Sequence, residues 1–184
     1  IDGIDVRDFN IKTLRSKIGF IRQKTLLFTG SIKSNIKFGK RKASHEEMVH
    51  SAKVAQAYDF INKKEKKFDE PIGEGGSNVS GGQKQRLSIA RALVRKPEIY
   101  IFDDSFSALD FKTDAILRAE LKKETTHAIV LIVAQRIGSI MDADKIIVLD
   151  EGNVVGIGKH KELLKTCSVY KEIALSQLTE EELA

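Results

Sequence analysis

The chain has 184 residues, a formal net charge of +5 and a pI near 9.2, with 41% hydrophobic and 31% charged residues. This composition is typical of a globular domain, and no run of about 18 apolar residues predicts a membrane span. The single cysteine, Cys167, excludes an internal disulfide and a cysteine-rich zinc site. The opening residues do not have the pattern of a signal peptide.

The first half of the chain changes from a strand pattern to a helical one. Residues 17–23 alternate and are rich in β-formers, which predicts a strand ending near Gln23. From residue 31 to 95 the pattern is mostly helical, with a capping box formed by Ser44 and Glu47. A glycine-rich stretch at 73–82 precedes a helix predicted over 83–96, which Pro97 ends.

The second half alternates strands and helices. The apolar runs 98–103 and 128–134 are typical of parallel strands covered on both faces. Between them, residues 111–124 form an amphipathic pattern that Asp110 could cap. A hairpin over 145–159 and a helical, highly charged tail from His160 onward follow. We therefore expect an α/β fold in which a helical subdomain is inserted into a parallel sheet.

Polar residues follow three of the predicted strands. Gln23 follows the first, Asp103 and Asp104 follow the second, and Gln135 follows the third. Ligands of open parallel sheets bind beyond the carboxyl ends of the strands. A strand-end aspartate suits Mg²⁺ that accompanies a nucleotide phosphate, and its neighbour could orient a water molecule. The aspartate pair alone is equally consistent with an ordinary turn.

The stretch "NVSGGQKQR" contains a candidate phosphate site. Gly81 and Gly82 let the backbone approach an anion, Ser80 offers a hydroxyl, and the helix that follows directs its first N–H groups forward. Taken alone, two glycines are also consistent with a plain loop that enters a helix.

Four stretches, in this order along the chain, resemble motifs of the ATP-binding cassette family. They are the Q-loop region of exporters at 20–39, the signature motif "VSGGQKQR" at 79–86, the Walker B strand and D-loop "IYIFDDSFSALD" at 99–110, and the switch region at 132–155. The resemblance covers nearly the whole chain. It implies an incomplete P-loop NTPase (RecA-like) core with an inserted helical subdomain, and ATP and Mg²⁺ as ligands.

The resemblance also implies a role for each matched residue. Asp103 and Gln23 would bind Mg²⁺, and Asp104 and Gln135 would take the catalytic positions. The nucleotide-binding residues would be Ser80, Gly81, Gly82, Gln83 and Asp110. In this family two such domains pair head to tail, so that each signature motif contacts the ATP bound by its partner.

The sequence departs from the family pattern in three places. The Walker A loop, G-x-x-x-x-G-K-[ST], does not occur, and the family places it upstream of residue 1, together with an adenine-stacking aromatic residue. Asp104 stands where active members have glutamate, and Gln135 stands where they have the switch histidine. The signature motif itself differs only in its leading residue, Val79 in place of leucine.

These departures predict a particular kind of transporter subunit. We expect the catalytically degenerate half of a heterodimeric exporter, partnered by a second nucleotide-binding domain and by transmembrane domains at the cytoplasmic face of the membrane. Its expected regions are 1–30, 31–95 and 96–184. A non-hydrolysing binding or regulatory fragment and a DNA-associated ATPase are the alternatives. No coiled-coil insertion supports the latter, and no nucleic-acid partner is expected.

The remaining distinctive residues receive structural interpretations. We expect all four histidines, His45, His50, His127 and His160, to have surface or capping roles, and Cys167 to be semi-buried. We interpret the lysine-rich runs at 37–42 and 63–67 as solvated surface.

Overall fold

The computed structural model describes residues 1–179 and divides into two compact units, Ile1–Val133 and a second that begins at Ala134. The first unit contains η1 Val6–Asp8, α1 Ile11–Lys17, β1 Ile18–Ile21, β2 Gly30–Ser31, α2 Ile32–Lys37, α3 His45–Val54, α4 Tyr58–Asn62, η2 Lys67–Asp69, β3 Pro71–Ile72, η3 Glu74–Gly76, α5 Gly81–Leu93, β4 Ile99–Asp103, α6 Phe111–Glu124 and β5 Ile129–Val133. The second contains η4 Ile137–Ser139, β6 Ile146–Asp150, β7 Asn153–Gly158, α7 His160–Thr166 and α8 Ser168–Leu175. Within residues 1–179, every helix is too short or too polar to cross a bilayer.

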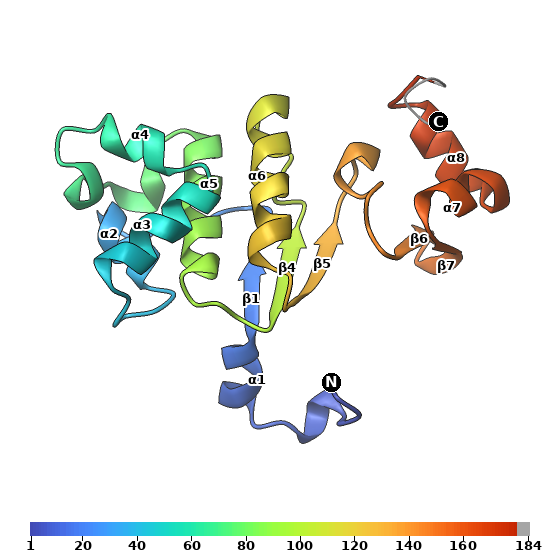
Figure 1. Cartoon of the computed structure of the whole chain (residues 1–184), viewed down its shortest axis with the longest axis horizontal. Coiled ribbons are helices and arrows are strands. Elements are labelled where there is room, and N and C mark those ends of the chain that lie inside the picture. The colour runs from blue at the N-terminus through green and yellow to red at the C-terminus, as the bar shows by residue number, and fades with distance from the viewer. Residues whose placement is uncertain (180–184) are drawn as a thin grey trace. The chain divides into compact units, whose positions relative to one another are not determined.

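A three-stranded parallel sheet organises the first unit (Figure 1). Its order is β1-β4-β5, with Phe20 opposite Ile101 and Ile101 opposite Leu131. The α/β fold with a parallel sheet is thus confirmed. Because the strands are parallel, their carboxyl ends lie at one edge. The residues that follow β1 and β4 are therefore neighbours.

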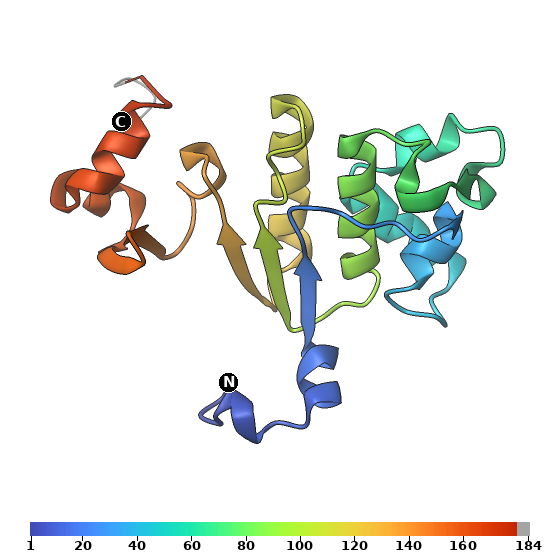
Figure 2. The ribbon, with the colours of Figure 1, turned by 180° about the vertical axis from the view of Figure 1, so that it is seen from behind.

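Within the described part of the first unit, helices cover one face of this sheet. Tyr100 and Phe102 of β4 are buried in a core that also contains Leu117 of α6. Figure 2 shows the opposite face, over which no described element of this unit passes. There Phe20 is 53% and Leu131 52% exposed.

The expectation that the apolar runs are covered on both faces is therefore wrong for β5. Four of its five residues are exposed, including Ile129 and Val133. A continuous apolar run shows that a strand can be buried on both faces. It does not show whether a second layer of structure covers the strand.

Helices α2, α3, α4 and α5 pack together to form the inserted helical part. The capping box of Ser44 and Glu47 is present at the start of α3. Helix α5 begins at Gly81, two residues earlier than the pattern predicted, because Ser80 caps it. Just after α2, the backbone approaches α5 closely at Gly39, where a Cβ atom would come within 2.0 Å of the Arg91 carbonyl oxygen. A short β2–β3 pair also lies here, which the helical pattern did not indicate.

The second unit is an antiparallel hairpin with two helices. Strands β6 and β7 pair as predicted, with a bulge between Val148 and Leu149. Leu163 and Tyr170 pack with Val148 in its core. Cys167, expected to be semi-buried, is buried there. The charged end of the predicted helical tail, residues 180–184, lies outside the described residues.

The surface role expected for His160 is wrong. It is the first residue of α7, but its ring is buried, with Nδ1 at 2.7 Å from the Tyr170 hydroxyl. The neighbouring tyrosine supplies the polar partner that allows a histidine to be buried, and this pairing across two helices is not visible in the sequence.

We expect two leucines to respond differently to truncation. Leu117→Ala removes a fully buried side chain and should lower the free energy of unfolding by about 2–5 kcal/mol. Leu131→Ala, on the exposed sheet face, should lower it by less than about 0.5 kcal/mol. Urea unfolding of the 184-residue chain measures both changes, and equal losses would show that the exposed face is covered.

Candidate functional site

Gln23 and Asp104 meet at the carboxyl edge of the sheet. Gln23 follows the end of β1, and its Nε2 donates a hydrogen bond to Asp104 Oδ2 at 2.9 Å. The Asp104 backbone adopts φ 43°, in the left-handed region, and its N–H donates to the Val133 carbonyl at 2.9 Å. A non-glycine residue in this region is unusual, and such residues are common at functional sites. The predicted strand-end cluster is thus present for these two residues.

The donor atoms at this edge fit Mg²⁺ bound together with a phosphate. Asp103 ends β4 with a half-buried side chain, and Asp104 follows directly. Residues 1–179 contain no group of three or more His, Cys, Asp or Glu side chains that could enclose a metal. Mg²⁺ takes one or two carboxylates and completes its shell with water and phosphate oxygens, so two aspartates and an amide match its needs.

Ser80, Gly81 and Gly82 form an exposed turn at the start of α5. Gln83 N–H donates to Ser80 Oγ at 3.3 Å, and Ser80 N–H donates to Gln83 Oε1 at 3.1 Å. Among the described residues, no atom lies within 4 Å of a Cβ placed at Gly81, whereas one at Gly82 would lie 3.2 Å from the Ala108 carbonyl oxygen. The turn is therefore rigid and open on one side, as an anion site at a helix N-terminus requires.

Asp110 has a structural role in the chain. Its carboxylate accepts the Thr113 N–H at 2.9 Å and caps α6, and this bond lowers the pKa of Asp110. Across from it, Arg86 of α5 donates through Nε to the Gly82 carbonyl at 3.2 Å and through Nη1 to the Gln56 carbonyl at 2.8 Å. Burial lowers the pKa of Arg86, and the charge of Asp110 opposes that shift. The nucleotide role of Asp110 stays a prediction.

Gln135 lies in the second unit. Its carbonyl accepts a hydrogen bond from Gln177 Nε2 at 2.7 Å, and Gln177 Oε1 accepts the Ile137 N–H at 2.9 Å. These bonds fix the backbone that carries Gln135. Its placement relative to Asp104 of the first unit stays a prediction.

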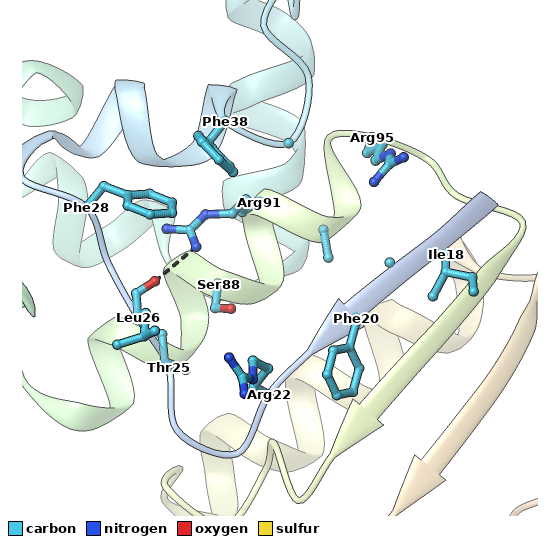
Figure 3. Close-up of a pocket in the computed structure, with 13 residues that line it drawn as sticks. Ile18, Phe20, Arg22, Thr25, Leu26, Phe28, Phe38, Ser88, Arg91 and Arg95 are labelled. Carbon is cyan, nitrogen blue, oxygen red and sulfur yellow. Dashed lines mark hydrogen bonds between the residues drawn. The ribbon is translucent and has the colours of Figure 1, made fainter. Parts of the chain in front are cut away.

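Sequence reasoning missed a groove of about 320 Å³ between β1, the loop that follows it and α5 (Figure 3). The groove combines positive charge with exposed apolar surface. Its arginines are Arg22, Arg91 and Arg95, and its aromatic residues are Phe20, Phe28 and Phe38. The aromatic residues and Arg22 lie in the Q-loop region at 20–39, whereas Arg91 and Arg95 lie in or just after α5. Only the tertiary structure brings these two segments together.

Arg91 holds the wall of this groove together by hydrogen bonds. Its guanidinium donates to the carbonyls of Asn35 and Leu26 at 2.9 and 3.0 Å and to Asn35 Oδ1 at 2.8 Å. The rings of Phe28 and Phe38 lie 5.1 and 5.9 Å away, within the range of cation–π contact. Burial lowers the pKa of Arg91 to about 10, so the group stays charged at neutral pH.

Comparison with known proteins identifies the family. A family model described as "ABC transporter" matches residues 1–107. The chain belongs to the ABC transporter family. It is 45% identical over 181 residues to the ABC transporter ATP-binding protein YfiB of Bacillus subtilis, covering 98% of this chain and 31% of YfiB. Multidrug resistance protein 1 of Entamoeba histolytica is 43% identical over 185 residues, covering 99% of this chain and 14% of that protein.

A solved ABC exporter has the same fold. The structure of a bacterial Atm1-family ABC exporter with ATP bound superposes with a TM-score of 0.91 at 37% identity, covering 94% of this chain and 30% of that chain. The chain thus spans about a third or less of the length of these ABC transporters. Its fold is that of an exporter nucleotide-binding domain, and the family as a whole is one of ATP-dependent transporters.

We expect Arg91 to be important for stability and Arg95, in the same groove, much less so. Arg91→Ala removes three hydrogen bonds, including one to the buried Asn35 side chain, and should cost about 3 kcal/mol. Arg95 donates to the Arg15 carbonyl at 2.8 Å on a more exposed surface, and Arg95→Ala should cost less than about 1 kcal/mol. Urea unfolding measures the loss of unfolding free energy in each variant. Similar losses would contradict the role of Arg91 in holding the groove wall together.

Proposed function

We propose that this chain is part of an ATP-binding subunit of an ABC exporter, in the catalytically degenerate half of a heterodimer. The observation that supports this most strongly is a contrast within one domain. The turn at Ser80 has its full set of capping hydrogen bonds. The carboxylate at the sheet edge, in contrast, belongs to Asp104, whose side chain is shorter than the glutamate of active family members. Such a subunit would present a competent signature turn to its partner's ATP while its own nucleotide turns over slowly.

The acidic edge would bind the nucleotide's metal through this chain's own residues. Asp103 would hold Mg²⁺, and the Gln23 amide would join the same polar network. When bound, Mg²⁺ neutralises charge on the phosphate oxygens. The protein's contribution is to fix these oxygen ligands on a rigid sheet edge.

Asp104 is a poor candidate for an efficient base. Its carboxylate is about 1.5 Å shorter in reach than that of a glutamate. A misplacement of this size can cost on the order of a hundredfold in rate. The Gln23 amide also occupies one of its oxygens. At the switch position, Gln135 can donate a hydrogen bond but cannot carry the charge of a protonated histidine.

The groove beside α5 would receive a helical loop of the transmembrane partner. Phe20, Leu26 and Phe38 expose apolar surface there, at 53%, 62% and 59%. Arg22 adds positive charge at its rim. A matching partner segment would insert an apolar side chain flanked by a carboxylate. Contacts made there would reach the loop that carries Gln23, which links the membrane partner to the nucleotide site.

We expect ATP hydrolysis to increase when the family's glutamate and histidine are restored at positions 104 and 135. Asp104→Glu combined with Gln135→His in the full-length heterodimer should raise steady-state turnover by at least about tenfold, because the base and the switch group regain reach and charge. Colorimetric phosphate release measures it. The wild-type subunit assayed without its partner should stay below typical enzyme rates of about 1 to 1000 per second.

Two results would contradict this assignment. Turnover by the isolated wild-type subunit within the typical range would show that its site is competent. The absence of any gain in the double variant would instead favour a purely binding or regulatory role.

We expect a charge in the groove to disrupt coupling to the membrane partner. Leu26→Asp should abolish the stimulation of ATP hydrolysis by transported compound while ATP binding is retained, because it buries a carboxylate at an apolar contact. Leu175→Asp, an exposed leucine of α8 in the second unit, is the matched control. Substrate-stimulated hydrolysis in lipid nanodiscs measures the effect, and equal behaviour of the two variants would exclude the groove as the docking site.

A further inference from the structure

Gln85 of α5 bonds to the loop that carries Gln23 on both sides of that residue. Its Nε2 donates to the Arg22 carbonyl at 3.3 Å, and its Oε1 accepts a hydrogen bond from the Thr25 hydroxyl. The Gln85 side chain is only 2% exposed. Both ends of a buried amide are therefore paired with the residues that flank Gln23.

Close to Gln23, the loop is held mainly by the Gln85 side chain. Residues 22–29 form no helix or strand, so no regular backbone ladder fixes their path. The next anchor along the chain is the Leu26 carbonyl, which accepts from Arg91 at 3.0 Å. Further along, Asn35 of α2 bonds to the N–H and the carbonyl of Phe28 at 2.9 and 2.8 Å. Gln85 and Arg91 both project from α5, so this helix fixes the part of the loop nearest Gln23. An unpaired buried amide is costly, which makes the Gln85 contacts hard to break singly.

On the other side of the loop, Gln23 reaches Asp104 at 2.9 Å. The Asp104 backbone is itself fixed by its N–H bond to Val133 and by the Ser107 hydroxyl, which donates to the Asp104 carbonyl at 2.9 Å. The distance between the Gln23 amide and the Asp104 carboxylate is then decided by the position of the loop. That position depends on Gln85.

We infer that Gln85 is a positioning residue that places the Gln23 amide at the acidic sheet edge. It acts through Gln23 and does not itself contact the ligand. The helix that carries Gln85 begins at Ser80, so a displacement of the signature turn would be transmitted to the metal-binding edge through this side chain. The part of this inference that concerns Mg²⁺ rests on the proposed function, whereas the part that concerns the loop does not.

The loop arm of the test uses hydrogen–deuterium exchange of the full-length transporter without nucleotide. Gln85→Met keeps the length and volume of the side chain but removes both bonds. We expect exchange in peptides covering residues 22–28 to increase by about tenfold, with peptides of α3 unchanged. Thr25→Val removes one bond from the loop side and should give a smaller increase. Ser51→Ala, which deletes a buried hydroxyl bonded to the Met48 carbonyl in α3, should leave residues 22–28 unchanged.

The ligand arm measures labelling of this subunit by 8-azido-ATP, with Mg²⁺ and with EDTA. We expect Gln85→Met and Gln23→Ala each to weaken the Mg²⁺-dependent part of labelling by about tenfold. The double variant should be no weaker than Gln23→Ala alone, because Gln85 acts through Gln23. A loss of fold would reduce labelling with and without Mg²⁺, which distinguishes positioning from general damage.

Unchanged exchange of residues 22–28 in both Gln85→Met and Thr25→Val would overturn the inference, whatever the nucleotide result. Additive losses of labelling in the double variant would overturn it as well. Absence of Mg²⁺-dependent labelling in the wild type would contradict the proposed function, and the exchange arm would still decide the role of Gln85.

Discussion

The parallel pairing of β1 with β4 is the constraint on which the candidate site depends. It brings the residues that follow the two strands to one edge of the sheet, although they are far apart in sequence. The hydrogen bond between Gln23 and Asp104 is the direct consequence. Any antiparallel arrangement of these strands would place the glutamine and the aspartates at opposite edges of the sheet. The candidate metal site would then not form.

Helix α5 connects this edge to the rest of the first unit. Its N-terminal turn at Ser80 is the candidate phosphate contact, its buried Gln85 holds the loop around Gln23, and its Arg91 forms the wall of the groove. One helix therefore touches the three features to which we assign a nucleotide contact, a metal site and a surface for a membrane partner. This arrangement explains how events at one feature can reach the others without a change of secondary structure.

Much of this could be predicted from the sequence because it depends on local patterns. The capping residues Ser44 and Asp110, the strand over β4 and the hairpin were all visible as residue types at fixed spacing. Three features were not visible in the sequence: the bond between Gln23 and Asp104, the burial of His160 against Tyr170, and the hydrogen bonds of Arg91. Each joins side chains from segments whose pairing is decided by tertiary packing, and an apolar strand such as β5 does not reveal whether a second layer covers it.

The most direct test of the central claim is a structure of the full-length transporter with Mg²⁺ and a non-hydrolysable ATP analogue. The account predicts that Ser80, Gly81 and Gly82 contact the terminal phosphate of the nucleotide bound by the partner subunit, while Asp103 and Gln23 face the metal of the nucleotide in their own subunit. A signature turn directed away from any nucleotide, or an acidic edge remote from the metal, would contradict it.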